Sequence, residues 1–293
     1  MTDWMSLSRR AAFVSHRMIG WIFWDPVGVA NYAALGVPDG LGYYVVTRAA
    51  PLAAAGSQAV TASFFSISPA YIDLSLDLCR EHTTFEAAAA ARDAAVVEGL
   101  HTYVPEICDE FAAMADPLWE VADSLSSSGR VLFAAHREWP RPDDQLLSAW
   151  LALNCLREWR GDTHFAIQVT EDLDGDMAGI LDNAWRSYEG DWIPRSRGAD
   201  DAALDAAYRK LEQRGLAEHG SVNEDGIRLR QELEDRLDRL TIPCWELFGA
   251  AHTERLIELI EPVDDRLIRR IDETAGTNWR PAGRVRPDSE PVR

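Results

Sequence analysis

The chain has 293 residues, 47% of them hydrophobic, which excludes global disorder and leaves room for two ordinary domains. Its formal net charge is -19, from 48 acidic and 29 basic residues. A field of this sign repels nucleic acid and anionic membranes unless basic residues gather locally, and the sequence contains no basic stripe.

Cysteine spacing and hydropathy predict a cytoplasmic protein without a membrane segment. The four cysteines lie far apart with no C-x-x-C pair, which argues against a disulfide framework and a zinc site. The apolar stretch 41–78 contains Arg48, Gln58 and Asp73, so we expect it to form buried helices instead of a membrane span.

The first 170 residues predict a helical domain, 1–170. The apolar pattern over 6–24 indicates a helix that ends at Asp25-Pro26, because the residue before proline disfavours helical backbone. Residues 43–50 are aromatic and β-branched, which leaves a strand and a buried helix open. Further helices are expected over 57–66, 69–80, 84–111, 116–128 and 146–169.

The later chain predicts a winged helix within residues 171–275. Helical segments at 176–188, 200–214 and 225–240 are separated by a loop at 190–198 and by a short passage centred on His219-Gly220. Helices followed by a hairpin and a long helix are the order of a winged helix. Residues 250–275 predict a terminal helix, and 276–293 a flexible tail. The fold class expected is therefore mainly α with a small β-hairpin wing.

Several phrases resemble a large uncharacterised actinobacterial family that has an N-terminal helical domain and a C-terminal MarR-like helix-turn-helix. They run over most of the chain, at Tyr44–Leu52, Arg130–His136, Leu156–His164, Leu211–Leu216, Asn223–Leu229 and Arg236–Phe248. The resemblance implies this domain order and says little about activity, because fold is weak evidence of function. The chain departs from the family at Asp25-Pro26-Val27-Gly28, where the family commonly has a histidine after Glu-Pro.

The densest polar cluster lies between Arg157 and His164. Asp162 beside His164 could orient the imidazole for proton transfer, and Arg157 and Arg160 could hold an anionic group. The alternative is an internal ion pair of Arg160 with Asp162 and a buried structural histidine.

A second set of candidate residues comes from the first helices. Arg48 lies in an apolar run, where an unpaired charge is costly, so it needs a ligand anion or a carboxylate such as Asp25 or Asp162. Asp25 is a further candidate for catalysis. Asn31, Tyr43 and Tyr44 are candidates for binding the substrate in the same cavity, although aromatic residues at helical spacing are more often core.

Other kinds of site have no support in the sequence. The seven histidines are dispersed without H-E-x-x-H, and there is no nucleophile elbow, Walker loop or dinucleotide-binding glycine pattern. We therefore expect no metal and no cofactor.

The expected recognition helix, Asp200 to Arg214, has four acids against three bases, and the wing adds Glu218 and Glu224. DNA-reading helices usually supply basic phosphate contacts, so DNA binding is disfavoured. A dimer could still gather Arg195, Arg197, Arg209 and Lys210 on one face.

The leading hypothesis is a protein that binds an anionic small molecule at the junction of its domains, as an enzyme of specialised metabolism. Its acid/base and anion-binding groups suit cyclisation, elimination or displacement of an anionic leaving group. The alternative is a ligand-responsive, MarR-like transcriptional regulator that binds DNA through the winged helix. A protein-interaction scaffold is the third hypothesis and would need an exposed Trp-rich patch. The sequence leaves a homodimer or a partner protein open.

Overall fold

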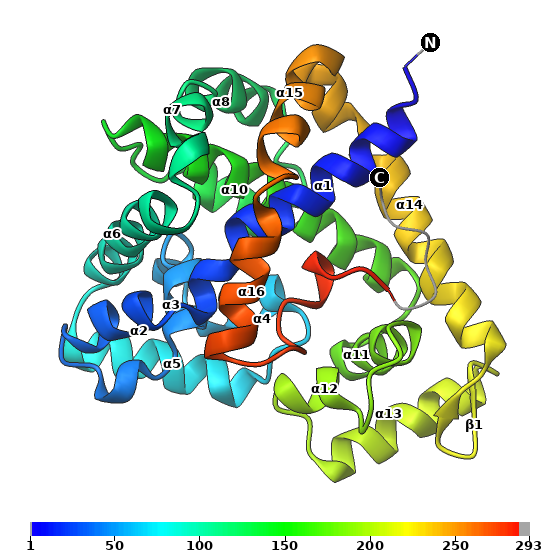
Figure 1. Ribbon diagram of the computed structural model, residues 1–293. Coiled ribbons are helices and arrows are strands. Elements are labelled where there is room, and N and C mark those ends of the chain that lie inside the picture. Colours follow the sequence, from blue (N-terminus) through cyan, green and yellow to red (C-terminus); the bar gives the residue numbers. More distant parts are fainter. Residues whose placement is uncertain (1, 287–293) are drawn as a thin grey trace.

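The computed structural model describes residues 2–286, and within that range the chain is helical apart from one two-stranded hairpin (Figure 1). The first part contains the helices α1 (Trp4–Gly20), α2 (Pro26–Ala33), α3 (Tyr43–Ala49), α4 (Ser57–Phe64), α5 (Pro69–His82), α6 (Phe85–Tyr103), α7 (Cys108–Ala112), α8 (Ala115–Ser124), α9 (Val131–Glu138) and α10 (Gln145–Thr170). The second part contains α11 (Gly175–Trp185), α12 (Trp192–Ser196), α13 (Asp201–Gln213), the strands β1 (Ala217–Glu218) and β2 (Ser221–Val222), then α14 (Glu224–Phe248), α15 (Ala250–Ile260) and α16 (Asp264–Thr274). Five short 3-10 helices join them, at Trp21–Trp24 (η1), Pro38–Gly40 (η2), Ala53–Ala55 (η3), Pro105–Ile107 (η4) and Pro281–Gly283 (η5).

Acidic and amide side chains set the first turns of many helices. Asp144 accepts a hydrogen bond from the Leu147 amide at 2.9 Å and caps α10. Asp174, Asp200 and Asn223 cap α11, α13 and α14 in the same way. Each cap satisfies a backbone N–H that would otherwise lack a partner. Part of the negative charge of the later chain is therefore used to begin helices.

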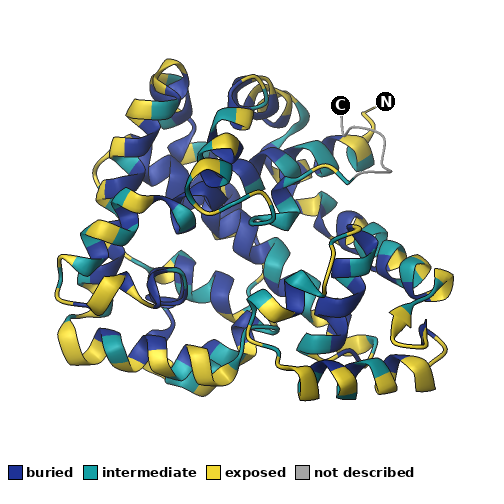
Figure 2. Ribbon diagram, turned by 60° about the horizontal axis from the view of Figure 1, so that its bottom comes forward, coloured by how far each residue is buried: buried dark blue, intermediate teal, exposed yellow. Residues whose placement is uncertain are grey.

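Helix α10 runs through the centre of the molecule and packs against α1, α8, α9 and α14 (Figure 1). Its buried residues join a large core with α1, α6–α8, the end of α14, α15 and α16, while a second core is built on α2–α5. Figure 2 shows buried residues gathered in the interior helices and exposed residues along the outer rows. Because α15 and α16 pack on α1, the packing crosses the boundary that the sequence suggested at residue 170.

The third core belongs to the winged helix. Leucines and alanines of α11, α13 and α14 pack together, with Leu181, Leu204, Leu211 and Leu233 at its centre. The hairpin pairs Ala217 with Val222 and Glu218 with Ser221. Its two turn residues, His219 and Gly220, both have positive φ, at 52° and 70°, as a two-residue hairpin turn of this type requires. The order α11, α12, α13, β1, β2, α14 matches the predicted winged helix.

Three segments differ in detail from the sequence-based expectations. Residues 43–49 form a helix, because their aromatic and branched side chains are buried on more than one face of α3. The loop expected at 190–198 contains the short helix α12, which the Asn183 side chain holds by accepting from the Ile193 amide at 2.9 Å. The single helix expected over 250–275 is two, α15 and α16.

The first part of the expected tail is packed against the fold. We call residues 277–286 the C-terminal strap; in Figure 1 it leads in red from the end of α16 toward α14. The Arg17 side chain donates to the Gly283 carbonyl at 2.8 Å, and Arg186 donates to the Pro281 carbonyl at 2.7 Å. The remainder of the expected tail, 287–293, lies outside the described residues.

Candidate functional site

A cavity of about 780 Å³ lies where the helical part, the winged helix and the strap meet. One wall comes from α1, η1 and α3, another from α10, and the opposite wall from α11, α12 and α14. The strap supplies seven lining residues, from Trp279 to Arg286. The volume falls in the range of small-molecule sites. This cavity is therefore the candidate functional site.

The cavity is basic although the chain is acidic. Its lining contains the carboxylates of Asp39, Asp182, Glu234 and Asp238 and the guanidinium groups of Arg9, Arg160, Arg186, Arg197, Arg230, Arg280, Arg284 and Arg286. Counting eight positive against four negative groups gives the lining a formal charge of four above neutrality. Such a lining attracts anions at close range.

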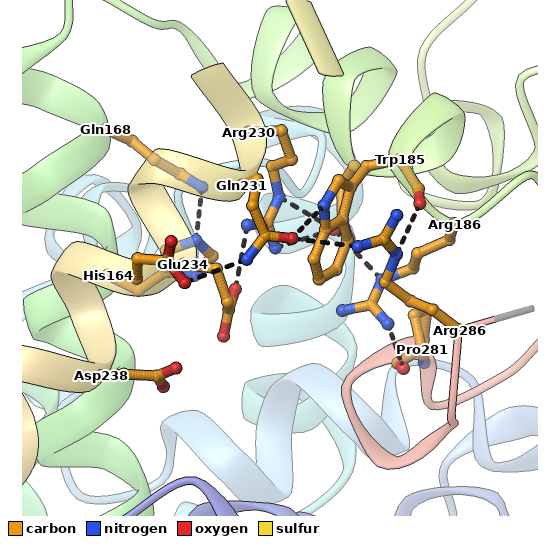
Figure 3. Close-up of polar contacts among 12 residues, drawn as sticks. His164, Gln168, Trp185, Arg186, Arg230, Gln231, Glu234, Asp238, Pro281 and Arg286 are labelled. Carbon is orange, nitrogen blue, oxygen red and sulfur yellow. Dashed lines mark hydrogen bonds and ion pairs between the residues drawn. The ribbon is translucent and has the colours of Figure 1, made fainter. Parts of the chain in front are cut away.

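Two long helices present polar faces to the cavity (Figure 3). On α10, Arg160 and His164 are four residues apart and share one face, and the Gln168 amide donates to His164 Nε2 at 2.9 Å. On α14, Arg230, Glu234 and Asp238 repeat at the same spacing. Arg160 joins the two helices, because its Nη2 contacts Glu234 at 2.7 Å and Asp238 at 3.0 Å.

Trp185 at the end of α11 is surrounded by guanidinium groups. Those of Arg286, Arg230 and Arg186 lie 4.0, 4.3 and 5.0 Å from its ring centres. Its indole N–H donates to Gln231 Oε1 at 3.0 Å, and Arg286 donates to the same oxygen (Figure 3). Arg286 also donates to the Trp185 carbonyl at 2.9 Å. The strap is thus attached to the winged helix at this residue.

The charge states at the cavity follow from burial and from this arginine cluster. Burial favours neutral carboxyls, but Arg186 and Arg230 outweigh it at Asp182 and hold the pKa of that carboxyl well below its usual range. Arg230 and Arg160 do the same for the pKa of Glu234. Burial, with Arg230 nearby, lowers the pKa of His164 to about 4. At neutral pH Asp182 and Glu234 are therefore ionised and the His164 imidazole is neutral.

Two cavity arginines have no carboxylate partner among the described residues. Arg280 donates through Nε to the His16 carbonyl at 2.9 Å, and its Nη2 lies 2.8 Å from His16 Nδ1. Arg197 donates to the Ser66 hydroxyl at 2.9 Å. Burial lowers the pKa of both guanidinium groups, that of Arg280 to about 9. A desolvated cation without a counter-ion is a place where a ligand anion would be stabilised.

Four of the residues predicted from the sequence line this cavity: Tyr43, Tyr44, Arg160 and His164. The Tyr43 hydroxyl is buried and makes no hydrogen bond with the described residues. Arg48 lies in a smaller adjoining cavity of about 120 Å³, which shares Tyr44 and His164 with the first. There its guanidinium is already paired with Glu158, at 2.8 and 2.7 Å, and donates to the Tyr44 hydroxyl at 2.9 Å.

The other predicted residues are placed elsewhere. Asp162 points away from His164 and accepts from the Phe133 amide at 2.9 Å, in the first turn of α9. Asp25 caps α2 and pairs with Arg270 at 2.9 Å. Asn31 donates to the Ala91 carbonyl, and Arg157 is buried against Glu158 and Asn154. The carboxylates expected to act in catalysis therefore do not reach the cavity.

Sequence reasoning missed the contributions of α14 and of the strap. The spacing of Arg230, Glu234 and Asp238 was visible, but charges at that spacing also mark an exposed helix face. Arg280, Arg284 and Arg286 lay in a proline-containing segment whose composition predicts a loose tail. No signal in the sequence pointed to that segment as part of a site.

Residues 2–286 contain neither a cluster of metal ligands nor a membrane-spanning helix. Among residues 2–286, no three His, Cys, Asp or Glu side chains gather as the ligands of a metal ion would. None of the helices in that range combines the length and the apolar character needed to cross a bilayer.

Comparison with known proteins gives one match. No curated protein and no solved structure matches the chain. A family model described as a helix-turn-helix family matches residues 8–273. The match covers most of the helical part as well as the winged helix. The chain therefore belongs to this helix-turn-helix family.

Proposed function

We propose that this protein is a ligand-responsive DNA-binding regulator of the MarR-like kind, whose winged helix responds to an anionic small molecule held in the cavity. The family supports the DNA-binding part of this proposal. The observation that carries the ligand-responsive part is the position of the cavity, whose walls come from the winged helix on one side and from α1 and α3 on the other.

Occupancy of the cavity would act on the winged helix through its walls. Arg197 directly follows α12, whereas Arg280 lies against α1 through His16. An anion that attracts both guanidinium groups draws the two walls together, and a ligand shifts a conformational equilibrium by its difference in affinity for the two states. The position of α13 would then depend on the ligand.

The surface that would meet DNA is acidic at one end and basic at the other. Asp201 and Asp205 are exposed near the start of α13, and Arg209 and Arg214 are exposed toward its end. Two other bases of this region are paired, Arg195 with Asp201 and Lys210 with Asp174. We therefore expect weak DNA binding that depends strongly on salt, unless a homodimer adds a second set of contacts.

DNA binding can be tested by fluorescence anisotropy with a labelled duplex from upstream of the protein's own gene, at 50 and 150 mM salt. The double variant Arg209→Gln, Arg214→Gln should bind more weakly at both, with a salt slope smaller by about two, because each lost phosphate contact removes about one released ion. The double variant Arg255→Gln, Arg269→Gln, exposed on α15 and α16, is the charge-matched control. Absence of binding at 50 mM, or equal affinity of wild type and the Arg209→Gln, Arg214→Gln variant, would refute the proposal.

The acidic start of α13 favours a second candidate, an enzyme in which the winged helix is a scaffold. Its neutral imidazole, His164, could accept a proton, and the arginines could stabilise an anionic leaving group. Incubation with a small-molecule extract of the source cells, followed by mass spectrometry, would then show a compound that wild type consumes and His164→Gln does not. Equal consumption by both proteins would exclude this role for His164.

The structure offers no support for a Trp-rich interaction surface. All 11 tryptophans lie in the described range, and each is buried or partly buried. The scaffold hypothesis required such a surface to be exposed, so we do not carry it further.

A further inference from the structure

The cavity contains a row of aromatic rings. Trp24 of η1 stacks on Tyr44 of α3, with ring centres 5.8 Å apart and planes 22° apart. Trp24 also meets Trp279 of the strap at 5.4 Å, and Trp279 meets Trp192 of α12 edge-on at 4.8 Å. All four side chains line the cavity and are partly exposed to it. The row thus runs without a break from the helical part across the strap to the winged helix.

Trp24, Tyr44 and Trp279 pack against the large core and, together with Trp192, also line the cavity, so part of their aromatic surface is available to a ligand. Aromatic faces suit the face or edge of another planar ring, at separations of about 4.5–7 Å. The wall is therefore suited to a planar apolar group.

A cation lies next to this wall. Arg280 follows Trp279 in the strap, and two of its nitrogens are held by His16, which leaves Nη1 without a hydrogen bond to the described residues. Arg280 and Arg197 line the same cavity as the four rings. Room for Arg280 depends on Gly20, because a Cβ there would lie 2.0 Å from Arg280 Nε.

We infer that the cavity binds an aromatic anion, whose ring lies against Trp24, Tyr44, Trp192 and Trp279 and whose charged group pairs with Arg280. The inference rests on the proposed function, since it names the class of ligand for that same cavity. The strap would complete the site by supplying both the central ring of the wall and the cation. Carboxylate, sulfonate and phosphate are the charged groups that a guanidinium binds through paired hydrogen bonds.

Isothermal titration calorimetry with three matched probes tests whether the cavity binds an aromatic anion. The probes are 2-naphthoate, the neutral 2-naphthamide and the saturated decahydro-2-naphthoate, which remove the charge and the aromatic ring in turn. Wild type should bind 2-naphthoate at least about tenfold more tightly than either of the others, since a hydrogen bond to a charged group is worth about a tenfold change or more. Equal binding of naphthoate and naphthamide, or no binding of naphthoate at millimolar concentration, would overturn the inference.

Three variants and one control test whether naphthoate binds at Arg280 and the aromatic row. Arg280→Met should lose most of the preference for naphthoate over naphthamide, while Arg269→Met, on the exposed face of α16, should retain it. Gly20→Ala displaces the Arg280 guanidinium without removing it and should weaken naphthoate binding in the same direction. Trp279→Leu should reduce the preference for naphthoate over its saturated analogue. Unchanged selectivity in Arg280→Met would place the anion elsewhere.

The melting temperature separates loss of binding from loss of the fold. Arg280→Met removes a desolvated charge that has no carboxylate partner among the described residues, so the ligand-free variant should melt at or above the wild-type temperature. The result is also independent of the DNA experiment. If the probes bind as expected and no DNA fragment does, the aromatic-anion site holds and the regulator function fails; the opposite pattern keeps the regulator and removes the inferred ligand class.

Discussion

Glu158 is the residue on which two buried arginines depend. It is fully buried, makes paired contacts with Arg48 and also contacts Arg157. Burial opposes its ionisation, but Arg157 and Arg48 outweigh that effect and hold its pKa well below the usual range. The anion that the sequence required for Arg48 is therefore supplied from within the chain, by a residue about three turns before the end of α10.

Replacing Glu158 by Gln should destabilise the fold strongly. Two guanidinium groups would remain buried without their carboxylate, which typically costs about 3–5 kcal/mol. Urea unfolding at pH 7 measures this change. Adding Arg48→Met to Glu158→Gln should restore part of the loss, because one of the unpaired charges is removed. A loss below about 1 kcal/mol would show that water or rearrangement replaces the carboxylate easily.

His164 should make the fold sensitive to acid. Its pKa is lowered to about 4 by burial and by Arg230, whereas an unfolded histidine titrates near 6.5. The stability gained by keeping the ring neutral is present above about pH 6.5 and is lost as the pH falls from 6.5 toward 4. Between pH 7 and 4.5, wild type should lose on the order of 2 kcal/mol more than His164→Gln, less than the full shift implies because the ring faces the cavity.

Comparing the two proteins removes the other titrating groups from this measurement. Asp162 and Asp264 have pKa values raised to about 6, chiefly by burial, and they change stability in the opposite direction over the same range. They are common to wild type and variant, so their contributions cancel. His101→Gln, at an exposed position of α6, is the matched control and should follow wild type. Parallel pH profiles for wild type and His164→Gln would contradict the lowered pKa.

The pairing of Asp162 with His164 shows where sequence reasoning failed at this scale. Both lie within α10, and residues two apart on a helix point about 200° away from each other. The helix expected over 146–169 already contained both residues, but their pairing took neighbours in sequence for neighbours in space. Arg160 and His164, four apart, do share the cavity face, as the same periodicity requires.

At the scale of elements, local signals in the sequence were sufficient to predict most of the winged helix. The positive-φ pair His219-Gly220, the cap at Asn223 and the apolar period of α13 each identify one element by a local physical rule. Helix α12 was missed because five residues with a central proline carry no period. The strap was missed because long-range contacts order it, through Arg17, Arg186 and Trp185.

The junction between α14 and the wing should depend on Gly226. A Cβ there would lie 2.4 Å from the Leu216 carbonyl oxygen and 2.6 Å from a Val222 methyl carbon, and the backbone oxygen cannot easily move. Gly226→Ala should therefore cost about 1–3 kcal/mol in thermal or urea unfolding. Gly161→Ala in α10 meets only Glu158 at 3.5 Å and should gain about 0.5–1 kcal/mol from helix propensity. Equal effects of both changes would show that the wing moves freely against α14.

At the scale of the whole molecule, the chain and the lining of its cavity carry net charges of opposite sign. The chain carries -19 overall, yet the cavity lining has more arginines than carboxylates. The net charge of the sequence therefore gave no indication that the lining of the cavity is positively charged. Arginines drawn from α1, α10, α11, α14 and the strap meet there only after folding, which is why no basic stripe appears in the sequence.

The same division predicts how DNA affinity can be raised. Asp201 and Asp205 are exposed near the start of α13, where a DNA backbone would approach a winged helix. Replacing both by Asn removes two repelling charges and frees Arg195 from its 2.7 Å ion pair with Asp201. We expect the double variant to bind an upstream duplex several-fold more tightly at 50 mM salt, with a gain that shrinks at 300 mM as screening increases.

The pair Asp109→Asn, Asp116→Asn, exposed on α7 and α8, makes the same change in net charge far from the winged helix and should leave affinity nearly unchanged. If both pairs raise the affinity equally, net charge alone governs binding and α13 has no special role; if neither does, the winged helix does not approach DNA through this face.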